Sequence, residues 1–127
     1  MSYDIDEERM AAGAAIVEKL GLLSKANPAI SDDLRAHTVQ ALFGTIWTRD
    51  GIDLKTRSLV TLTSLMALNR EHELTLHIRG ARNLGITRET IEEVILHVAH
   101  YAGWPVAITA SSVLDAVWKE MDEEKDQ

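Results

Sequence analysis

Apolar residues recur along nearly the whole chain with the three- and four-residue spacing of an amphipathic α-helix. No stretch shows the strict apolar–polar alternation that a half-buried β-strand requires. The spacing predicts helices over about residues 4–23, 34–47, 54–69 and 71–84, a fifth that starts after Thr87, and a sixth that ends near Met121. We therefore expect an all-α bundle of about six helices with short connections, formed by a single domain over residues 1–127.

Capping residues mark several of the expected helix ends. The segment Ser31-Asp32-Asp33 indicates the start of the second helix, and Asp53 and Thr87 are suited to cap the third and the fifth. Gly85 stands where a residue in the left-handed conformation would close the fourth helix. These residues predict tight connections between successive helices.

The expected third helix is apolar around most of its circumference rather than on one face. Leucines and a methionine cover it almost completely, with Val60 and Ala67 in the gaps. A helix of this kind is buried on several sides. In a chain of 127 residues, we expect a partner subunit to supply part of that burial.

Composition narrows the class of protein without naming a function. The net charge of −7 disfavours binding to nucleic acid or to an anionic membrane, and five acids among residues 120–127 predict a solvated acidic tail. The acidic N-terminus lacks the apolar core of a signal peptide, and no apolar run is long enough to span a membrane. We expect a cytoplasmic protein.

Three ionisable residues follow one edge of the fourth helix, on the side that its apolar residues mark as the core. Arg70, Glu73 and His77 are spaced three and four residues apart, so they form a polar file along that edge. A buried histidine held by a glutamate for packing alone would explain two of them. Three ionisable groups in one file favour a functional site instead, because buried charges concentrate at such sites.

Further candidates flank this file. His97 and Tyr101 are neighbours on the fifth helix at the edge of its apolar stripe, where they could form a pocket wall, whereas His100 points to the opposite face. Arg49 and Arg57 bracket the loop after the second helix, and Trp47 precedes it as either a pocket residue or a core residue.

The usual cofactor signatures are absent. The sequence has no glycine-rich dinucleotide or phosphate-binding motif, and no serine nucleophile in a strand–turn–helix context. Glu73, His77 and His97 could form a two-histidine, one-carboxylate metal set, but their spacing is not the HExxH arrangement. We therefore expect neither metal nor cofactor.

Three blocks of this sequence resemble the carboxymuconolactone decarboxylase family in order and spacing. They are Gly44-Thr-Ile-Trp47-Thr-Arg49-Asp-Gly51-Ile-Asp53-Leu-Lys-Thr-Arg57, Glu73-Leu-Thr-Leu-His77-Ile-Arg-Gly-Ala-Arg-Asn83-Leu-Gly85, and Glu92-Glu93-Val-Ile-Leu-His97-Val-Ala-His-Tyr101-Ala-Gly103-Trp-Pro105. The resemblance implies the AhpD-like helical fold and a ring-like homo-oligomer, a homo-trimer or homo-hexamer. It also extends to alkylhydroperoxidases with a Cys-x-x-Cys pair, whose cysteine positions are Arg70 and Glu73 here and whose acidic relay is Ser58. A chain without cysteine is thereby placed in the decarboxylase branch.

The resemblance implies cofactor-independent decarboxylation of 4-carboxymuconolactone to the 3-oxoadipate enol-lactone, in aromatic-acid catabolism. In this interpretation His77 is the general acid and Glu73 orients it and keeps it protonated, while Arg49, Arg57 or Arg70 hold the carboxylates of the substrate. Side chains that shape the pocket are Trp47, His97 and Tyr101. A related decarboxylase or proton-transfer enzyme for another small acid or lactone, and a non-catalytic oligomeric protein that binds a small ligand, are the alternatives.

Overall fold

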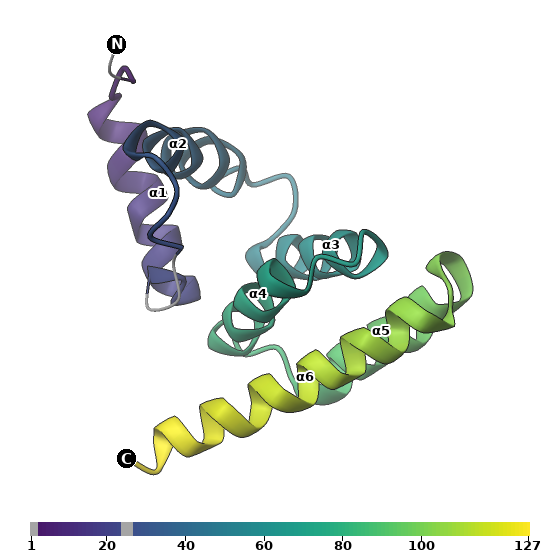
Figure 1. The fold of residues 1–127 in the computed structure, drawn as a ribbon. Coiled ribbons are helices and arrows are strands. Elements are labelled where there is room, and N and C mark those ends of the chain that lie inside the picture. Colours follow the sequence, from purple (N-terminus) through teal and green to yellow (C-terminus); the bar gives the residue numbers. More distant parts are fainter. Residues whose placement is uncertain (1–2, 24–26) are drawn as a thin grey trace.

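The computed structural model describes residues 3–23 and 27–127, and every regular element in these ranges is a helix. The described residues form six α-helices and one π-helix, η2, and Figure 1 shows their path from the N-terminus to the C-terminus. They are α1 (Glu7–Leu20), α2 (Asp32–His37), η2 (Thr38–Ile46), α3 (Leu54–Ala67), α4 (Glu71–Asn83), α5 (Arg88–Ala102) and α6 (Trp104–Lys125). The predicted all-α class is confirmed.

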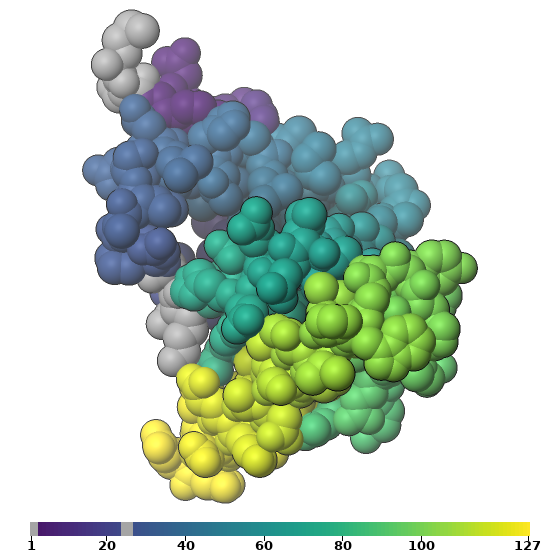
Figure 2. Space-filling model, turned by 45° about the vertical axis from the view of Figure 1, so that its right-hand side comes forward, coloured from purple at the N-terminus to yellow at the C-terminus, as the bar shows by residue number. Residues whose placement is uncertain are grey.

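The helices form three tiers. α1, α2 and η2 lie together at one end, the long hairpin of α5 and α6 lies at the other, and α3 and α4 lie between them (Figure 1). The surface has the same order from the N-terminal to the C-terminal part (Figure 2). One buried apolar cluster joins α3, α4, α5 and α6. A smaller cluster joins α1 to η2 and to Trp47, which follows η2; its residues are Val17, Leu20, Phe43 and Trp47. The candidate site lies where the two clusters meet.

The predicted caps are found at the helix starts. Carboxylate Oδ1 of Asp53 accepts a hydrogen bond from the Thr56 amide at 2.7 Å, and the Thr87 hydroxyl accepts one from the Thr90 amide at 3.2 Å. Ser31 caps α2 in the same way. α1 is shorter than predicted, because Asp6 caps its start and Gly21 ends it in the left-handed conformation, at φ 72°.

The second helix differs from its prediction in kind. The apolar spacing predicts one continuous helix, but after His37 the chain widens into the nine-residue π-helix η2. η2 crosses α1 at two glycines: a Cβ atom on Gly44 would lie 2.1 Å from the Arg9 carbonyl oxygen, and one on Gly13 would lie 2.0 Å from that of Val39. Apolar spacing does not encode this backbone contact. π-helical turns are rare and often occur at functional sites.

The predicted solvated tail is helical for most of its length. α6 continues through residue 125 with Met121 buried within it, while residues 122–127 are exposed. The Arg79 side chain, only 7% exposed, donates to both carboxylate oxygens of Glu124 at 2.9 and 2.8 Å, and its Nη1 lies 3.4 Å from Glu120. The acidic residues remain part of the helix because they neutralise a buried arginine of α4.

We expect the double substitution Glu120→Gln and Glu124→Gln to lower the free energy of unfolding by about 1–3 kcal/mol, because it leaves the buried Arg79 charge without a carboxylate. Urea unfolding followed by circular dichroism measures the change. Glu123→Gln on the exposed face of α6 is the control with one charge removed. Equal losses in the two variants would contradict the role of the pair.

None of the helices in the part of the chain that the structure describes has the length and apolar character needed to cross a bilayer.

Candidate active site

The core of the candidate site is a ring stack between Trp47 and His77. η2 ends immediately before Trp47 and delivers its side chain, which is 4% exposed, against α4. The indole and imidazole centroids are 6.2 Å apart, with an angle of 25° between the ring planes. The structure thus joins two predicted site residues that are thirty positions apart in the sequence.

His77 is a half-buried histidine whose environment opposes a positive charge. Burial lowers the pKa of His77 below its ordinary value, and the negative charge of Glu73 raises it by a smaller amount. Its Nδ1 atom is buried without a hydrogen-bond partner among the described residues. Glu73 thus acts in the direction of the expected role, which is to keep His77 protonated, and burial acts more strongly against it.

The polar file of α4 does not face the core along its whole length. Glu73 and Arg70 are exposed at the start of the helix, and only His77 extends into the protein. α4 begins at Glu71, so Glu73 lies in its first turn and Arg70 is its N-cap residue, and water reaches both side chains. Glu73 is placed to act on His77 through its charge.

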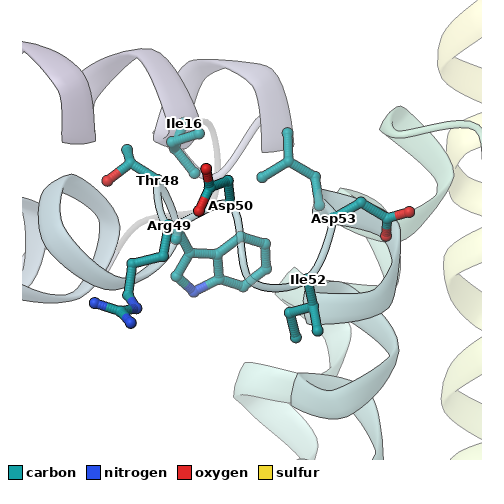
Figure 3. A pocket seen from close by; sticks show the side chains of 8 residues that line it. Ile16, Thr48, Arg49, Asp50, Ile52 and Asp53 are labelled. Carbon is teal, nitrogen blue, oxygen red and sulfur yellow. The ribbon is translucent and has the colours of Figure 1, made fainter.

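Arg49 and Arg57 meet at the loop between η2 and α3. The Arg57 Nη2 atom donates to the Arg49 carbonyl oxygen at 3.2 Å, which fixes the loop to the first turn of α3. The Arg57 Nε atom is buried and has no partner among the described residues, while the Arg49 side chain is exposed. In Figure 3, the side chains of Arg49 and Asp53 extend to opposite sides of this loop.

A cavity of about 540 Å³ opens beside the loop. Trp47 belongs both to its wall and to the stack with His77, so the indole connects the cavity to the histidine. Asp50 and Asp53 also face it, beside apolar side chains (Figure 3). The complete lining is Ile16, Trp47, Thr48, Arg49, Asp50, Ile52, Asp53 and Leu54.

His97 and Tyr101 lie elsewhere in the chain. Their rings stack on each other, with centroids 5.0 Å apart, and they line a separate cavity of about 260 Å³ with Thr63 and Ala67 of α3. Tyr101 is 83% exposed. A single chain therefore does not bring this pair to His77, and the described residues contain no group of three His, Cys, Asp or Glu side chains that could hold a metal ion.

Three buried polar residues of the described chain are missing from the site residues that the sequence predicts. Arg79 is a structural residue that pairs with α6, and Gln40 bonds to the backbone before α1. Ser58 is 1% exposed on α3, directly after Arg57, and its hydroxyl has no hydrogen-bond partner among the described residues. The sequence gives only a weak sign that Ser58 is buried. It lies four residues before Leu62, on the face of the helix where the spacing predicts an apolar residue.

The chain is similar to proteins of known family. The sequence profile of the carboxymuconolactone decarboxylase family matches residues 32–116. Over 79 residues the chain is 42% identical to a 4-carboxymuconolactone decarboxylase of Acinetobacter baylyi, covering 62% of this chain and 59% of the relative. It is 43% identical over 79 residues to a nitrosuccinic acid decarboxylase of Metarhizium robertsii, covering 62% and 55%.

An uncharacterized 15.0 kDa protein of Paracoccus denitrificans is 30% identical over 104 residues, which cover 80% of this chain and 75% of that protein. The alignments with the two decarboxylases thus span less than three-fifths of the length of either relative.

Proposed function

The chain belongs to the carboxymuconolactone decarboxylase family, and we propose that it is a cofactor-independent carboxy-lyase that converts 4-carboxymuconolactone to the 3-oxoadipate enol-lactone. The observation that carries this proposal is the 42% identity to a protein named for that reaction. The half-buried histidine stacked on Trp47, with Arg49 on the loop after Trp47 and Arg57 on the first turn of α3, is compatible with it.

The reaction needs no cofactor because the substrate accepts the electrons itself. Breaking the bond to the departing carboxylate releases carbon dioxide and leaves an electron pair, which the unsaturated lactone delocalises onto its carbonyl oxygen. A proton then adds to carbon and gives the enol-lactone. The protein has to hold an anionic substrate, stabilise the developing oxyanion and supply one proton.

In the proposed mechanism His77 supplies the proton to carbon. Burial lowers the pKa of His77 in the free chain, and an anionic substrate beside the ring would raise it, so substrate binding favours proton uptake by the ring. Glu73 adds to this effect through its charge. The imidazole regains its proton from solvent after each turnover.

Arg49 and Arg57 are the proposed carboxylate-binding residues. Arg49 lies on the loop that lines the cavity, and Arg57 on α3 donates to the Arg49 carbonyl oxygen. The buried Arg57 Nε–H lacks a partner among the described residues, and a carboxylate oxygen would provide one. Arg70, exposed at the start of α4, is the alternative cation. We place the proposed enzyme in the cytoplasm, where small acids of catabolism are processed.

The similarity to a nitrosuccinic acid decarboxylase favours a second candidate substrate class. A nitro group next to the departing carboxylate accepts the electron pair as a nitronate, just as the lactone accepts it as a dienolate. The same histidine and arginines would serve either acid. The alternative function is therefore decarboxylation of another small acid that carries its own electron acceptor.

Assaying purified protein with 4-carboxymuconolactone and with nitrosuccinate, and measuring carbon dioxide release and product by NMR, tests the proposal. Turnover of the lactone at the higher kcat/KM supports the first function, and preference for nitrosuccinate supports the second. A ligand-induced rise in Tm without release of carbon dioxide would overturn both and indicate a binding protein.

The proposed enzyme assembles as a homo-trimer or homo-hexamer. Large apolar side chains lie exposed along α5 and α6, with Leu96, Trp104 and Ile108 around a groove of about 290 Å³. Tyr101 is exposed near them, and Val60 and Leu68 are exposed on α3, the helix that sequence analysis marks as apolar all round. An apolar surface of this kind is typical of subunit interfaces.

We expect Ile108→Lys to convert the oligomer to monomers, because it would bury an unpaired charge in the interface. Size-exclusion chromatography with light scattering measures the mass. Ala15→Lys, on the exposed face of α1 away from this surface, is the control with an added charge that should leave the mass unchanged. An unaltered mass in the Ile108→Lys variant would place the interface elsewhere.

A further inference from the structure

Asp50 is an acidic residue in the wall of the cavity of about 540 Å³. Its carboxylate has no hydrogen bond and no ion pair within the part of the chain that the structure describes. The neighbouring Arg49 does not pair with it, and the two side chains extend in different directions from the loop (Figure 3). A molecule that enters the cavity therefore meets a free negative charge.

The other acid of this cavity wall has a structural role. Asp53 caps α3, where its carboxylate accepts a hydrogen bond from the Thr56 amide at 2.7 Å, and hydrogen bonds from Thr56 lower the pKa of the Asp53 carboxyl. Asp50 lies in the loop between η2 and α3 and caps no helix. Helix capping thus explains Asp53 and leaves Asp50 unexplained.

The cavity wall is divided into a cationic part and a part that is anionic and apolar. Arg49 provides the positive charge of the lining. Asp50 shares the wall with Ile16, Ile52 and Leu54, whose side chains have no hydrogen-bond donor for an anion. An anionic group beside these residues is repelled by Asp50 and is stabilised by none of the three apolar side chains.

This division favours one orientation of a substrate with two carboxylates, of which one leaves as carbon dioxide. An arginine paired with the departing carboxylate would stabilise the bound substrate more than the transition state, because the negative charge moves out of that group during the reaction. Pairing Arg49 with the retained carboxylate avoids this loss. The departing carboxylate then lies toward Asp50 and the apolar part of the wall.

We propose that Asp50 is a catalytic residue that faces the departing carboxylate and repels it in the bound substrate. The inference rests on the proposed function, because it requires a substrate that loses a carboxylate. When the carbon–carbon bond breaks, carbon dioxide leaves without charge and the electron pair passes to the lactone carbonyl oxygen. Asp50 stays ionised and transfers no proton. The repulsion is present in the bound substrate and is relieved in the transition state.

Kinetics of Asp50→Asn with 4-carboxymuconolactone test the proposal, since asparagine keeps the shape of the side chain and removes its charge. We expect kcat and KM to fall together by about five- to tenfold, with kcat/KM within about twofold of the wild type. Asp126→Asn removes the same charge from the exposed C-terminal end of α6 and should leave both constants unchanged.

Two other kinetic results would overturn the proposal. A lower KM with unchanged kcat would mean that Asp50 repels the substrate and the transition state equally. A lower kcat with unchanged KM would mean that Asp50 makes a favourable contact in the transition state instead. The Tm of Asp50→Asn should equal that of the wild type, because the carboxylate is bonded to no other described residue, so a loss of folded protein does not explain a lower kcat.

Binding of unreactive acids tests the same repulsion without turnover. Isothermal titration calorimetry compares glutarate, which has two carboxylates, with butyrate, which has one. We expect Asp50→Asn to lower the Kd of glutarate by about five- to tenfold and to leave that of butyrate unchanged. An unchanged Kd for glutarate would overturn the proposal. If the wild-type chain releases no carbon dioxide, the proposed function fails, but the glutarate comparison still decides whether Asp50 opposes a second carboxylate in the cavity.

Discussion

Replacing His77 with glutamine should lower kcat for 4-carboxymuconolactone by about 10²–10⁴-fold and leave the fold intact. Glutamine fills similar space next to Trp47 but cannot transfer a proton, so the variant removes the proposed general acid without removing the packing. Stopped or continuous assays of carbon dioxide release under saturating substrate measure the effect. Near wild-type turnover would eliminate His77 as the proton donor.

His100→Gln is the matched control for this substitution. His100 is an exposed histidine of α5 whose ring bonds to the Leu96 carbonyl, away from the cavity and from Trp47. Its replacement should leave kcat and KM unchanged. Equal losses in the two variants would indicate a general effect of removing a histidine rather than a role at the site.

The dependence of the rate on pH tests the same assignment of His77 as the proton donor. A general acid works in its protonated form, and burial lowers the pKa of His77. Values of kcat/KM should therefore fall as pH rises through a pKa below 6.5, while kcat, which reports the substrate complex, should fall at higher pH because the bound anion raises that pKa. The His77→Gln variant should not show this fall in rate with rising pH. A wild-type profile that rises with pH over this range would instead indicate a histidine base.

Local sequence signals predict the fold well where backbone capping decides the structure. Asp53 and Thr87 cap the helices that they were expected to cap, and Gly85 adopts the left-handed conformation at φ 89°. These features depend on a few neighbouring residues. The acidic end of the chain depends on a distant residue as well: residues 122–127 are exposed, but Glu120 and Glu124 pair with Arg79, and the sequence near residue 120 gives no sign of this contact.

Only part of the candidate site can be predicted from the sequence, because its geometry also depends on residues that are distant in the chain. Family blocks select Trp47, Arg57 and His77, but the stack between the rings and the burial that lowers the pKa of His77 depend on how α3, α4 and η2 pack. The helix wheel assigned Glu73 to the core side, whereas the start of α4 is open to water. Apolar spacing does not reveal the π-helix η2. Its close backbone contact with α1 requires only that Gly13 and Gly44 have no side chains.

That contact makes Gly44 a position where one methyl group should have a large effect. A Cβ atom there would lie 2.1 Å from the Arg9 carbonyl oxygen, so α1 and η2 would have to separate. We expect Gly44→Ala to lower the free energy of unfolding by about 3 kcal/mol. Because η2 carries Trp47 to His77, kcat/KM should fall as well.

Gly51→Ala separates the contact from the loss of glycine flexibility. Gly51 lies in the loop beside the cavity, nothing stands within 4 Å of a Cβ atom built on it, and its backbone is not in the left-handed region. Its replacement should leave the unfolding free energy unchanged or raise it by about 0.5 kcal/mol, since alanine restricts the unfolded chain. Urea unfolding of both variants measures the difference, and the dependence of the unfolding free energy on urea concentration is compared with that of the wild type. Equal stabilities would show that α1 and η2 can shift apart at no cost, and that the close crossing does not hold Trp47 in place.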